Sequence, residues 1–325
     1  MNKLSGTLAC AALGISATVL TPTPTLAQQY PGKPVKIIVA FAPGGGTDFI
    51  ARFIAQRLSA SLGQQFIVEN KPGAGGSIGT ESGVRSPPDG YTLTMISSSY
   101  TVNPSLYKLK FDPVADITPI IQLSRGPLIV VVNPSLPVKN IEELIALAKA
   151  RPAQISFASP GSGSNSHLAG ELFTSMARIK MTHVPYKGTG PALTDTLAGH
   201  TNVLFGTNSS VLPHVRTGRL RALAVTTTQR LTAEPAIPTV AESGVPGYEV
   251  ALWHGLIGPK GLPRPIVDRI NSEATQTLKL PETVGKLQND GVSPAGGTPE
   301  QFLATIRGEI VVWRKVVNEL GVKVE

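Results

Sequence analysis

Apolar and polar positions follow a repeated order along the chain: a short apolar run, a Gly- or Ser-rich turn, and a segment with helical periodicity. In the first unit, a β-branched run at 35–41 leads through three glycines at 44–46 into a helix-like segment. The apolar residues of that segment recur at helical spacing, Ile50, Phe53, Ile54 and Leu58. Further strand-length runs lie at 64–70, 91–96, 155–159, 181–186, 201–206 and 220–227. This alternation predicts an α/β fold with a parallel sheet and helices on its faces.

Two longer extended stretches interrupt the alternation and predict passages of the chain between two domains. At 117–135 two strand-like runs flank Arg125–Gly126–Pro127, and at 248–259 a second extended run ends in Gly and Pro. Helices beginning near Pro265, Pro281 and Pro299 then close the chain. We expect a discontinuous first domain, 28–125 plus 251–325, and a second domain, 126–250. The sheets are expected to be parallel or mixed, with a ligand cleft between the domains.

Composition indicates a packed and exported protein. Apolar residues make up 41% and charged residues 15% of the 325 residues, which predicts a folded core. Residues 1–27 are typical of a secretory signal, ending in a small-residue cleavage site at Ala27. This segment holds the single cysteine, Cys10, and a cysteine-free mature chain suits an oxidising compartment such as a periplasm. Loss of Lys3 lowers the formal charge from +8 to +7, and the remaining basic residues are too dispersed to predict nucleic-acid binding.

Four polar loops at strand ends carry the candidate chemistry. They lie at 43–48, 97–103, 159–166 and 206–210, two in each predicted domain. Thr47 is expected to cap the first helix, with Asp48 in its first turn. A helix start leaves backbone N–H groups free and carries partial positive charge, so it can hold an anion. The sequence therefore predicts two domains that close on one small anion.

Enzyme motifs are weak or absent. GxxxxGK[ST] and GxSxG do not occur, and Gly73, Gly75 and Gly79 lack the spacing of a dinucleotide-binding loop. The histidines show no metal-ligand spacing, and we expect neither a metal nor a cofactor. One enzymatic alternative is open, a secreted hydrolase or isomerase with Ser164 as nucleophile and His167 as base.

Several segments, in order, resemble the solute receptors of tripartite tricarboxylate transporters, also called the Bug family of periplasmic binding proteins. They read YPGKPVKIIVAFAPGGGTDFIAR, VENKPGAGGSIG, PPDGYTL, FASPGSGSNSHLAGELF, VPYKGTGPAL, LRALAVTT and EVALWHGLIGPKGLP. The resemblance covers about 30–325. It implies a two-domain periplasmic-binding-protein fold of type II-like architecture that closes on its ligand. It also implies no catalytic activity, a small carboxylate as ligand, and a membrane permease as partner.

The resemblance further implies which residues bind the ligand. In the first domain they are Gly45, Gly46, Thr47 and Asp48. In the second they are Ser162, Gly163, Ser164 and Asn165, with His167 just behind. Loops that vary within the family add Ser97, Ser98 and Asn208.

Three questions stay open at this point. The Asp48 carboxylate either folds back on its own helix turn or points into the cleft, where it would favour a ligand bearing an amine. The closed receptor either delivers its ligand to a permease or docks on a signalling protein as a sensor. The identity of the carboxylate is not fixed by the residues.

Overall fold

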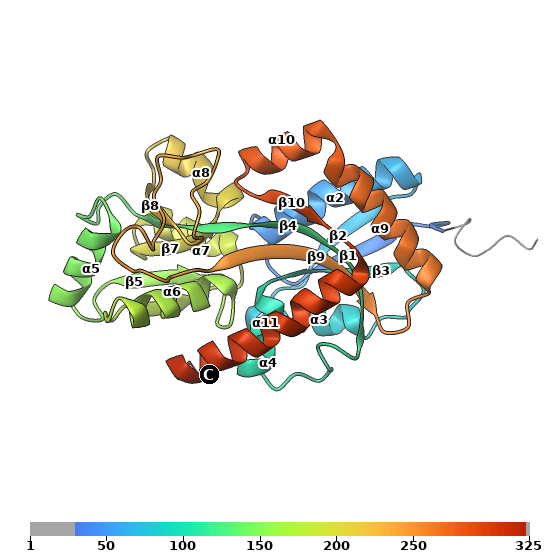
Figure 1. Ribbon diagram of the computed structural model, residues 1–325, viewed down its shortest axis with the longest axis horizontal. Coiled ribbons are helices and arrows are strands. Elements are labelled where there is room, and N and C mark those ends of the chain that lie inside the picture. Colours follow the sequence, from blue (N-terminus) through green and yellow to red (C-terminus); the bar gives the residue numbers. More distant parts are fainter. Residues whose placement is uncertain (1–29, 323–325) are drawn as a thin grey trace, which may run out of the picture.

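The computed structural model describes residues 30–322, and the expected signal segment 1–27 lies outside them. The described chain forms two α/β lobes that lie side by side, joined by two long strands running through both (Figure 1). We call the lobe that contains the N-terminal strands lobe 1 and the other lobe 2. The expected α/β fold with two lobes is confirmed.

Lobe 1 begins with three parallel strands. Strand β1 (Val35–Val39) pairs with β2 (Phe66–Asn70) on one side and with β3 (Thr92–Ser97) on the other. The helices between them are α2 (Gly46–Leu62), α3 (Ser77–Val84), which follows a short 3-10 turn (Ala74–Gly76), and α4 (Ser99–Leu106). The C-terminal part of the chain returns to this lobe as α9 (Arg264–Lys279), α10 (Pro281–Asn289), β10 (Ser293–Gly296) and α11 (Pro299–Leu320).

Lobe 2 repeats the pattern. Strand β5 (Ser156–Ser159) pairs in parallel with β6 (Thr182–Pro185) and with β7 (Val203–Thr207). The remaining elements are α5 (Ile141–Ala150), α6 (Asn165–Met176), α7 (Thr189–Ala198), α8 (Asn208–Arg216) and β8 (Arg221–Val225).

Two strands connect the lobes and make the sheet mixed. Strand β4 (Ile117–Val132) pairs antiparallel with β9 (Ala251–Pro259) and β10 at its start, and with β7 and β8 at its end. Strand β9 also pairs antiparallel with β3. The Arg125–Gly126–Pro127 segment therefore lies inside one continuous strand, since Arg125 to Pro127 stay paired with Trp253 to Ala251. The domain boundaries at 125/126 and 250/251 stay predictions.

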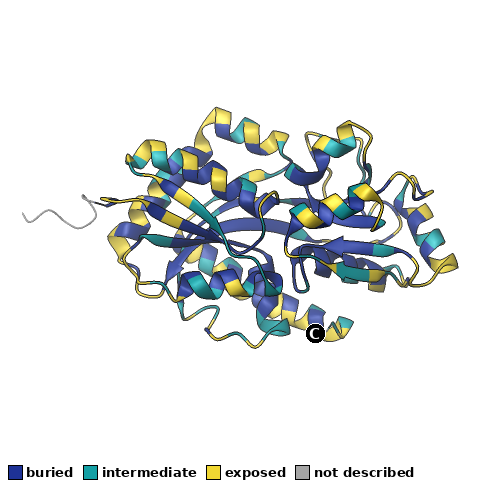
Figure 2. Cartoon of the chain, turned by 180° about the vertical axis from the view of Figure 1, so that it is seen from behind, coloured by how far each residue is buried: buried dark blue, intermediate teal, exposed yellow. Residues whose placement is uncertain are grey.

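Hydrophobic burial follows the lobes. Lobe 1 is built around β1 and β3 with α2 and α9, and lobe 2 around the end of β4 with α5 and α6. Figure 2 shows the central strands buried and the exposed faces of the helices turned outward, whereas the edge strands β2 and β6 are partly exposed. Helix α11 takes part in both lobes: Phe302, Ile306 and Ile310 pack in lobe 1, whereas Trp313 and Val317 pack against the core of lobe 2.

Three local expectations are wrong. Residues 206–210 are not a loop, because strand β7 ends at Thr207 and helix α8 begins at Asn208. Residues 97–103 are not a loop, because Ser99–Leu106 forms α4, whose Tyr100 is buried and stacks on Phe111. Thr47 is not the cap of α2, because the helix already starts at Gly46 with Gly45 in the cap position and no capping side chain. For α4 the reason is packing, because burial of Tyr100 stabilises a helix in a segment whose Ser- and Thr-rich composition favours a turn.

Candidate functional site

A small cavity between the lobes is surrounded by helix starts. Gly45 and Thr47 come from the start of α2, Ser99 from α4, Thr189 from α7, and Thr207 from the residue before α8. The start of α6 contributes three consecutive polar residues, and the full lining is Phe41, Gly45, Thr47, Ser97, Ser99, Leu128, Pro160, Ser164, Asn165, Ser166, Thr189, Thr207 and Leu252. We call this the cleft cavity. None of its lining residues within 30–322 carries a charged side chain.

The cleft cavity is narrow. Its volume is about 30 Å³, which admits about two water molecules. Direct hydrogen bonds join the lobes around it, from Gly46 N to Thr207 Oγ1 at 3.1 Å, from Ser210 Oγ to Gly44 O at 3.0 Å, and from the hydroxyl of Tyr107 to Ser162 O at 2.6 Å. A larger occupant therefore enters while the lobes are apart, and the lining side chains must shift when the lobes close on it.

The glycine triplet lets the loop before α2 approach lobe 2. Gly44 has φ +90°, a left-handed conformation that favours glycine. Gly45 and Gly46 are required for a different reason, which is that a side chain has no room there. A Cβ on Gly45 would lie 2.9 Å from Thr189 Oγ1, and one on Gly46 would lie 2.9 Å from Thr207 Cβ. The absence of these side chains allows the two lobes to touch at the cavity.

The Asp48 carboxylate turns back onto its own lobe. It accepts hydrogen bonds from Gly44 N at 3.2 Å, from Arg52 Nε at 3.0 Å and from Asn70 Nδ2 at 3.0 Å, and it does not line the cleft cavity. Burial raises the pKa of Asp48, but the hydrogen bonds and charge of Arg52, with Asn70 and Gly44, outweigh it, so the pKa is lowered overall. Asp48 is thus an ionised, buried side chain that stabilises the loop before α2.

The stacked rings of His167 and His183 support the loop before α6. Ser164 caps the helix by accepting from His167 N at 3.2 Å, and His167 Nδ1 accepts from Gly163 N at 3.1 Å. The His167 ring stacks on His183, with centroids 3.9 Å apart, and His183 Nε2 lies 2.6 Å from Ser159 Oγ. Burial, and then the neighbouring His167, lower the pKa of His183 to about 3, so this ring is neutral at physiological pH.

This arrangement is unsuited to a Ser–His nucleophile. The Ser164 hydroxyl oxygen bonds the backbone of His167, while the imidazole of His167 bonds Gly163 and faces Glu171 at 3.6 Å. A general base must lie within hydrogen-bond reach of the proton that it abstracts, and here the imidazole is engaged elsewhere.

The residues implied by the resemblance fall into two groups. Gly45, Thr47, Ser97, Ser164 and Asn165 line the cleft cavity. The others lie beside it and support the same loops: Gly46, Asp48, Ser98, Ser162, Gly163, His167 and Asn208. For example, Asn208 Nδ2 donates to Pro127 O at the crossing strand, and Ser98 N donates to Trp253 O.

Four lining residues lie in the predicted polar loops but are not among the residues that the resemblance implies: Ser99, Pro160, Ser166 and Thr207. Sequence reasoning missed Phe41, Leu128, Thr189 and Leu252, which lie outside those loops. Thr189 follows the same strand-to-helix rule as the predicted loops, so the rule applied to every such junction would have found it. Leu128 and Leu252 carry no local signal, because they reach the cavity from the crossing strands β4 and β9.

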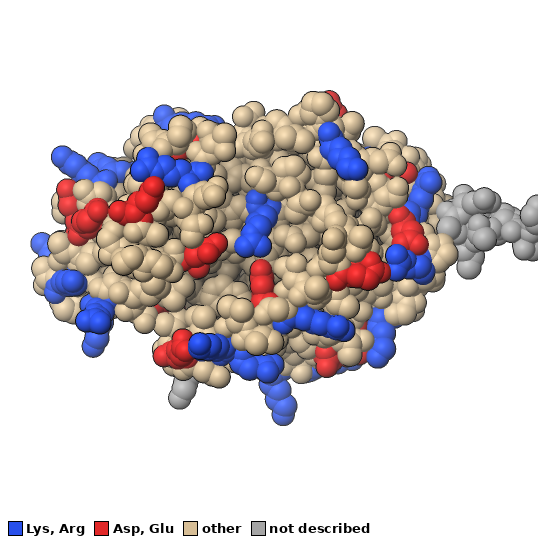
Figure 3. Space-filling view, viewed as in Figure 1, with Lys and Arg blue, Asp and Glu red and all other residues tan. Residues whose placement is uncertain are grey.

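Charges on the surface are interspersed, and Figure 3 shows no broad patch of one sign on the face that it presents. Within residues 30–322 no helix is long and apolar enough to cross a membrane. The same part of the chain brings together no group of three His, Cys, Asp or Glu side chains suited to a metal.

Curated relatives match along nearly the whole chain. Protein BugT of Bordetella pertussis is 38% identical over 312 residues, covering 95% of this chain and 96% of BugT. A protein encoded in the tcbD-tcbE intergenic region of Pseudomonas sp. (strain P51) is 35% identical, covering 93% of this chain and 92% of its own.

Solved structures agree in fold. The periplasmic binding protein BugD superposes with a TM-score of 0.87 at 33% identity, covering 90% of this chain and 99% of BugD. R. palustris Rpa4515, solved with adipate, gives a TM-score of 0.88 at 35% identity, covering 90% and 99%. MatC of Rhodopseudomonas palustris, solved with bound malate, gives 0.85 at 29% identity, covering 89% and 100%.

These matches lead to periplasmic substrate-binding receptors and not to enzymes. The model of the tripartite tricarboxylate transporter family receptor matches residues 50–322, most of the described chain. The expected resemblance is confirmed, and the chain belongs to the family of tripartite tricarboxylate transporter receptors.

Proposed function

We propose that the cleft cavity binds a small organic carboxylate by closure of the two lobes, and that the closed receptor delivers this ligand to a membrane permease. The convergence of the starts of α2, α4, α6, α7 and α8 on one cavity carries the proposal. Each start contributes partial positive charge and backbone N–H groups that have no carbonyl partner within their own helix, so the cavity attracts an anion without an Arg or Lys side chain.

The energetics suit this arrangement. Micromolar binding requires about 8 kcal/mol. Hydrogen bonds to a charged group contribute about 1.5–3 kcal/mol each, and a helix start contributes about 0.3–1 kcal/mol. A few hydroxyl or backbone donors from each lobe, added to several helix starts, reach that range only when both lobes contact the same ligand. Binding is therefore expected to be coupled to closure.

The proposed ligand-binding residues are those implied by the resemblance: Gly45, Gly46, Thr47, Asp48, Ser97, Ser98, Ser162, Gly163, Ser164, Asn165, His167 and Asn208. Among them we expect Thr47, Ser97, Ser164 and Asn165 to contact the ligand, because they line the cavity. Asp48, His167 and Asn208 are expected to act by holding the loops. Relatives solved with adipate and with malate support a carboxylate as the ligand class.

Calorimetric titration of the mature protein with a panel of mono- and dicarboxylates tests this function. We expect saturable one-to-one binding for at least one acid, and no binding of its amide or alcohol analogue. Thr47→Ala is expected to weaken binding by about tenfold, which corresponds to the loss of one hydrogen bond to a charged group. A panel in which neutral analogues bind as well as acids would contradict the proposal.

A further inference from the structure

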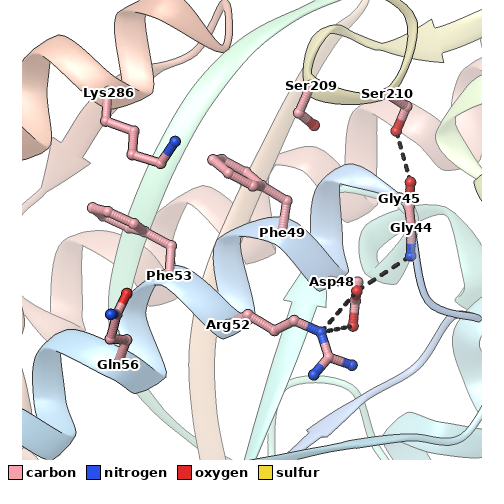
Figure 4. A pocket seen from close by; sticks show the side chains of 10 residues that line it. All are labelled: Gly44, Gly45, Asp48, Phe49, Arg52, Phe53, Gln56, Ser209, Ser210 and Lys286. Atoms are coloured by element: carbon pink, nitrogen blue, oxygen red, sulfur yellow. Dashed lines mark hydrogen bonds and ion pairs between the residues drawn. The ribbon is translucent and has the colours of Figure 1, made fainter. Parts of the chain in front are cut away.

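A second hollow lies outside the cleft cavity, against the outer side of α2. It has a volume of about 430 Å³, within the range of small-molecule sites. Its lining comprises Gly44, Gly45, Asp48, Phe49, Arg52, Phe53, Gln56, Ser209, Ser210 and Lys286, and we call it the outer groove (Figure 4). It shares only Gly45 with the lining of the cleft cavity.

The floor of the outer groove is aromatic. Phe49 and Phe53 lie on successive turns of α2, with ring centroids 6.3 Å apart and planes within 18° of parallel. Phe49 is partly exposed, so its ring offers apolar surface to an occupant. An apolar body the size of a ring would remove this surface from water.

Positive charge lies directly over that floor. The Lys286 ammonium, carried by α10, lies 5.5 Å from the centroid of the Phe49 ring. Its acidic neighbour Asp290 is 3.7 Å away, which is longer than a hydrogen bond, so the ammonium keeps donors for another acceptor. Figure 4 shows the Lys286 side chain and the Ser209 hydroxyl extending toward the Phe49 ring from different helices. The Ser209 hydroxyl has no hydrogen-bond partner among residues 30–322.

The other charges at the groove are already matched. Asp48 is paired with Arg52 at 3.0 Å, and Arg57, whose guanidinium lies 5.5 Å from the Phe53 centroid, is paired with Glu282 at 2.7 Å. Lys286 therefore dominates the electrostatics of the floor. An occupant of complementary chemistry has a carboxylate for Lys286 and Ser209, and an apolar body for Phe49.

Residues of both lobes line the outer groove. Phe49 and Lys286 belong to lobe 1, whereas Ser209 and Ser210 belong to lobe 2. The two sides are joined by the hydrogen bond from Ser210 Oγ to Gly44 O at 3.0 Å. An occupant that contacts both Lys286 and Ser209 adds contacts that are present only in the closed form.

We propose that the outer groove is an accessory site for a small carboxylate with an apolar, ring-sized body, and that its occupation favours closure of the lobes. By linkage, such an occupant tightens binding in the cleft, and a cleft ligand tightens binding in the groove by the same factor. The coupling rests on the proposed function, whereas the site itself does not.

Fluorine NMR titration with para-fluorobenzoate tests the site. The wild-type protein, Lys286→Met and Ser209→Ala are compared, with Lys279→Met on the neighbouring helix α9 as the matched control for loss of one lysine charge. We expect Lys286→Met to weaken binding of the probe by about tenfold and Ser209→Ala by about threefold, with Lys279→Met unchanged. Thermal unfolding checks that each variant is folded.

The same titration in the presence of saturating adipate separates the groove from the cleft. Probe binding that persists or tightens in adipate supports the accessory site. Displacement of the probe by adipate, equal binding to wild type and Lys286→Met, or no binding at millimolar probe would overturn it. If adipate does not bind, the proposed function of the cleft cavity is not supported for this acid. The accessory site is still tested independently, because Lys286→Met should weaken probe binding and Lys279→Met should not.

Discussion

At the scale of single residues, Gly46 is a position where the backbone of lobe 1 closely approaches a side chain of lobe 2 near the cleft. Gly46→Ala would place its Cβ 2.9 Å from both Cβ and Cγ2 of Thr207. Alanine is the better helix former, so lobe 1 itself should not be weakened. The clash with Thr207 should instead destabilise the closed form by about 1–3 kcal/mol. Carboxylate affinity should therefore fall by about five- to hundredfold.

Calorimetric affinity and thermal unfolding of the Gly46→Ala variant check this prediction together. The matched control is Gly308→Ala on α11, where an added Cβ meets nothing within 4 Å. The control should bind as wild type does. Unchanged affinity in Gly46→Ala would mean that closure leaves more room at Thr207 than the structure shows.

Asp48 supports a prediction about pH. Because the pKa of Asp48 is lowered in the folded protein, its contribution to stability is present above the unfolded value of about 3.9 and is lost as pH falls through the lower folded value. Asp48→Asn should lower the free energy of unfolding by about 1–3 kcal/mol at pH 7, and this deficit should shrink below about pH 4. Urea unfolding of wild type and Asp48→Asn at pH 7 and at a pH below about 4 measures this difference in the free energy of unfolding.

The control for Asp48→Asn is Asp268→Asn, which removes an exposed pair with Arg264 at 2.7 Å and should cost about 0.5 kcal/mol or less. A second measurement addresses the ligand. If Asp48→Asn changed ligand specificity while the free energy of unfolding stayed constant, the carboxylate would face the ligand. Its assignment as a side chain that stabilises the loop before α2 would then be wrong.

At the scale of elements, periodicity predicted most strands and helices because each buries one face against its own lobe. Helix α11 is an instructive case. Its apolar residues recur at helical spacing, and five of them are buried, Phe302, Ile306, Ile310, Trp313 and Val317, whereas Leu320 at the end of the same stripe is only partly buried. The first half of these residues packs in lobe 1 and the second half in lobe 2. The sequence does not predict this division, because it depends on how the crossing strands position the two lobes.

The elements that escaped prediction are those set by partners distant in sequence. Helix α4 contains Pro104, and its hydroxyl-rich start suggests a turn. It is stabilised by α11, where Glu309 accepts from Thr101 Oγ1 at 3.2 Å and from Trp253 Nε1 at 2.7 Å. For the same reason the candidate site was predicted at its loops, whereas Leu128 and Leu252 were missed on the crossing strands.

At the scale of the whole molecule, the closed arrangement depends on contacts that do not require a ligand. Lobe 1 and lobe 2 are bridged by the hydroxyl of Tyr107, which donates to Ser162 O at 2.6 Å, and by Gly46 N, which donates to Thr207 Oγ1 at 3.1 Å. These bonds lower the free energy of the closed form relative to an open form. Affinity for the ligand therefore includes the free energy of closure as well as contacts to the ligand.

Tyr107→Phe isolates that contribution, because Tyr107 contacts the loop backbone and does not line the cleft cavity. Loss of one neutral hydrogen bond of about 0.5–1.5 kcal/mol should weaken ligand binding by about two- to tenfold. The control is Tyr100→Phe, which removes a hydrogen bond of equal length, 2.6 Å, to Pro113 O within lobe 1. Both variants should lose similar stability, but only Tyr107→Phe should lose affinity and show a larger radius of gyration by X-ray scattering without ligand. Equal affinities for the two variants would indicate that the lobes already close fully before the ligand arrives, since a bond present in both the free and the bound protein does not affect binding.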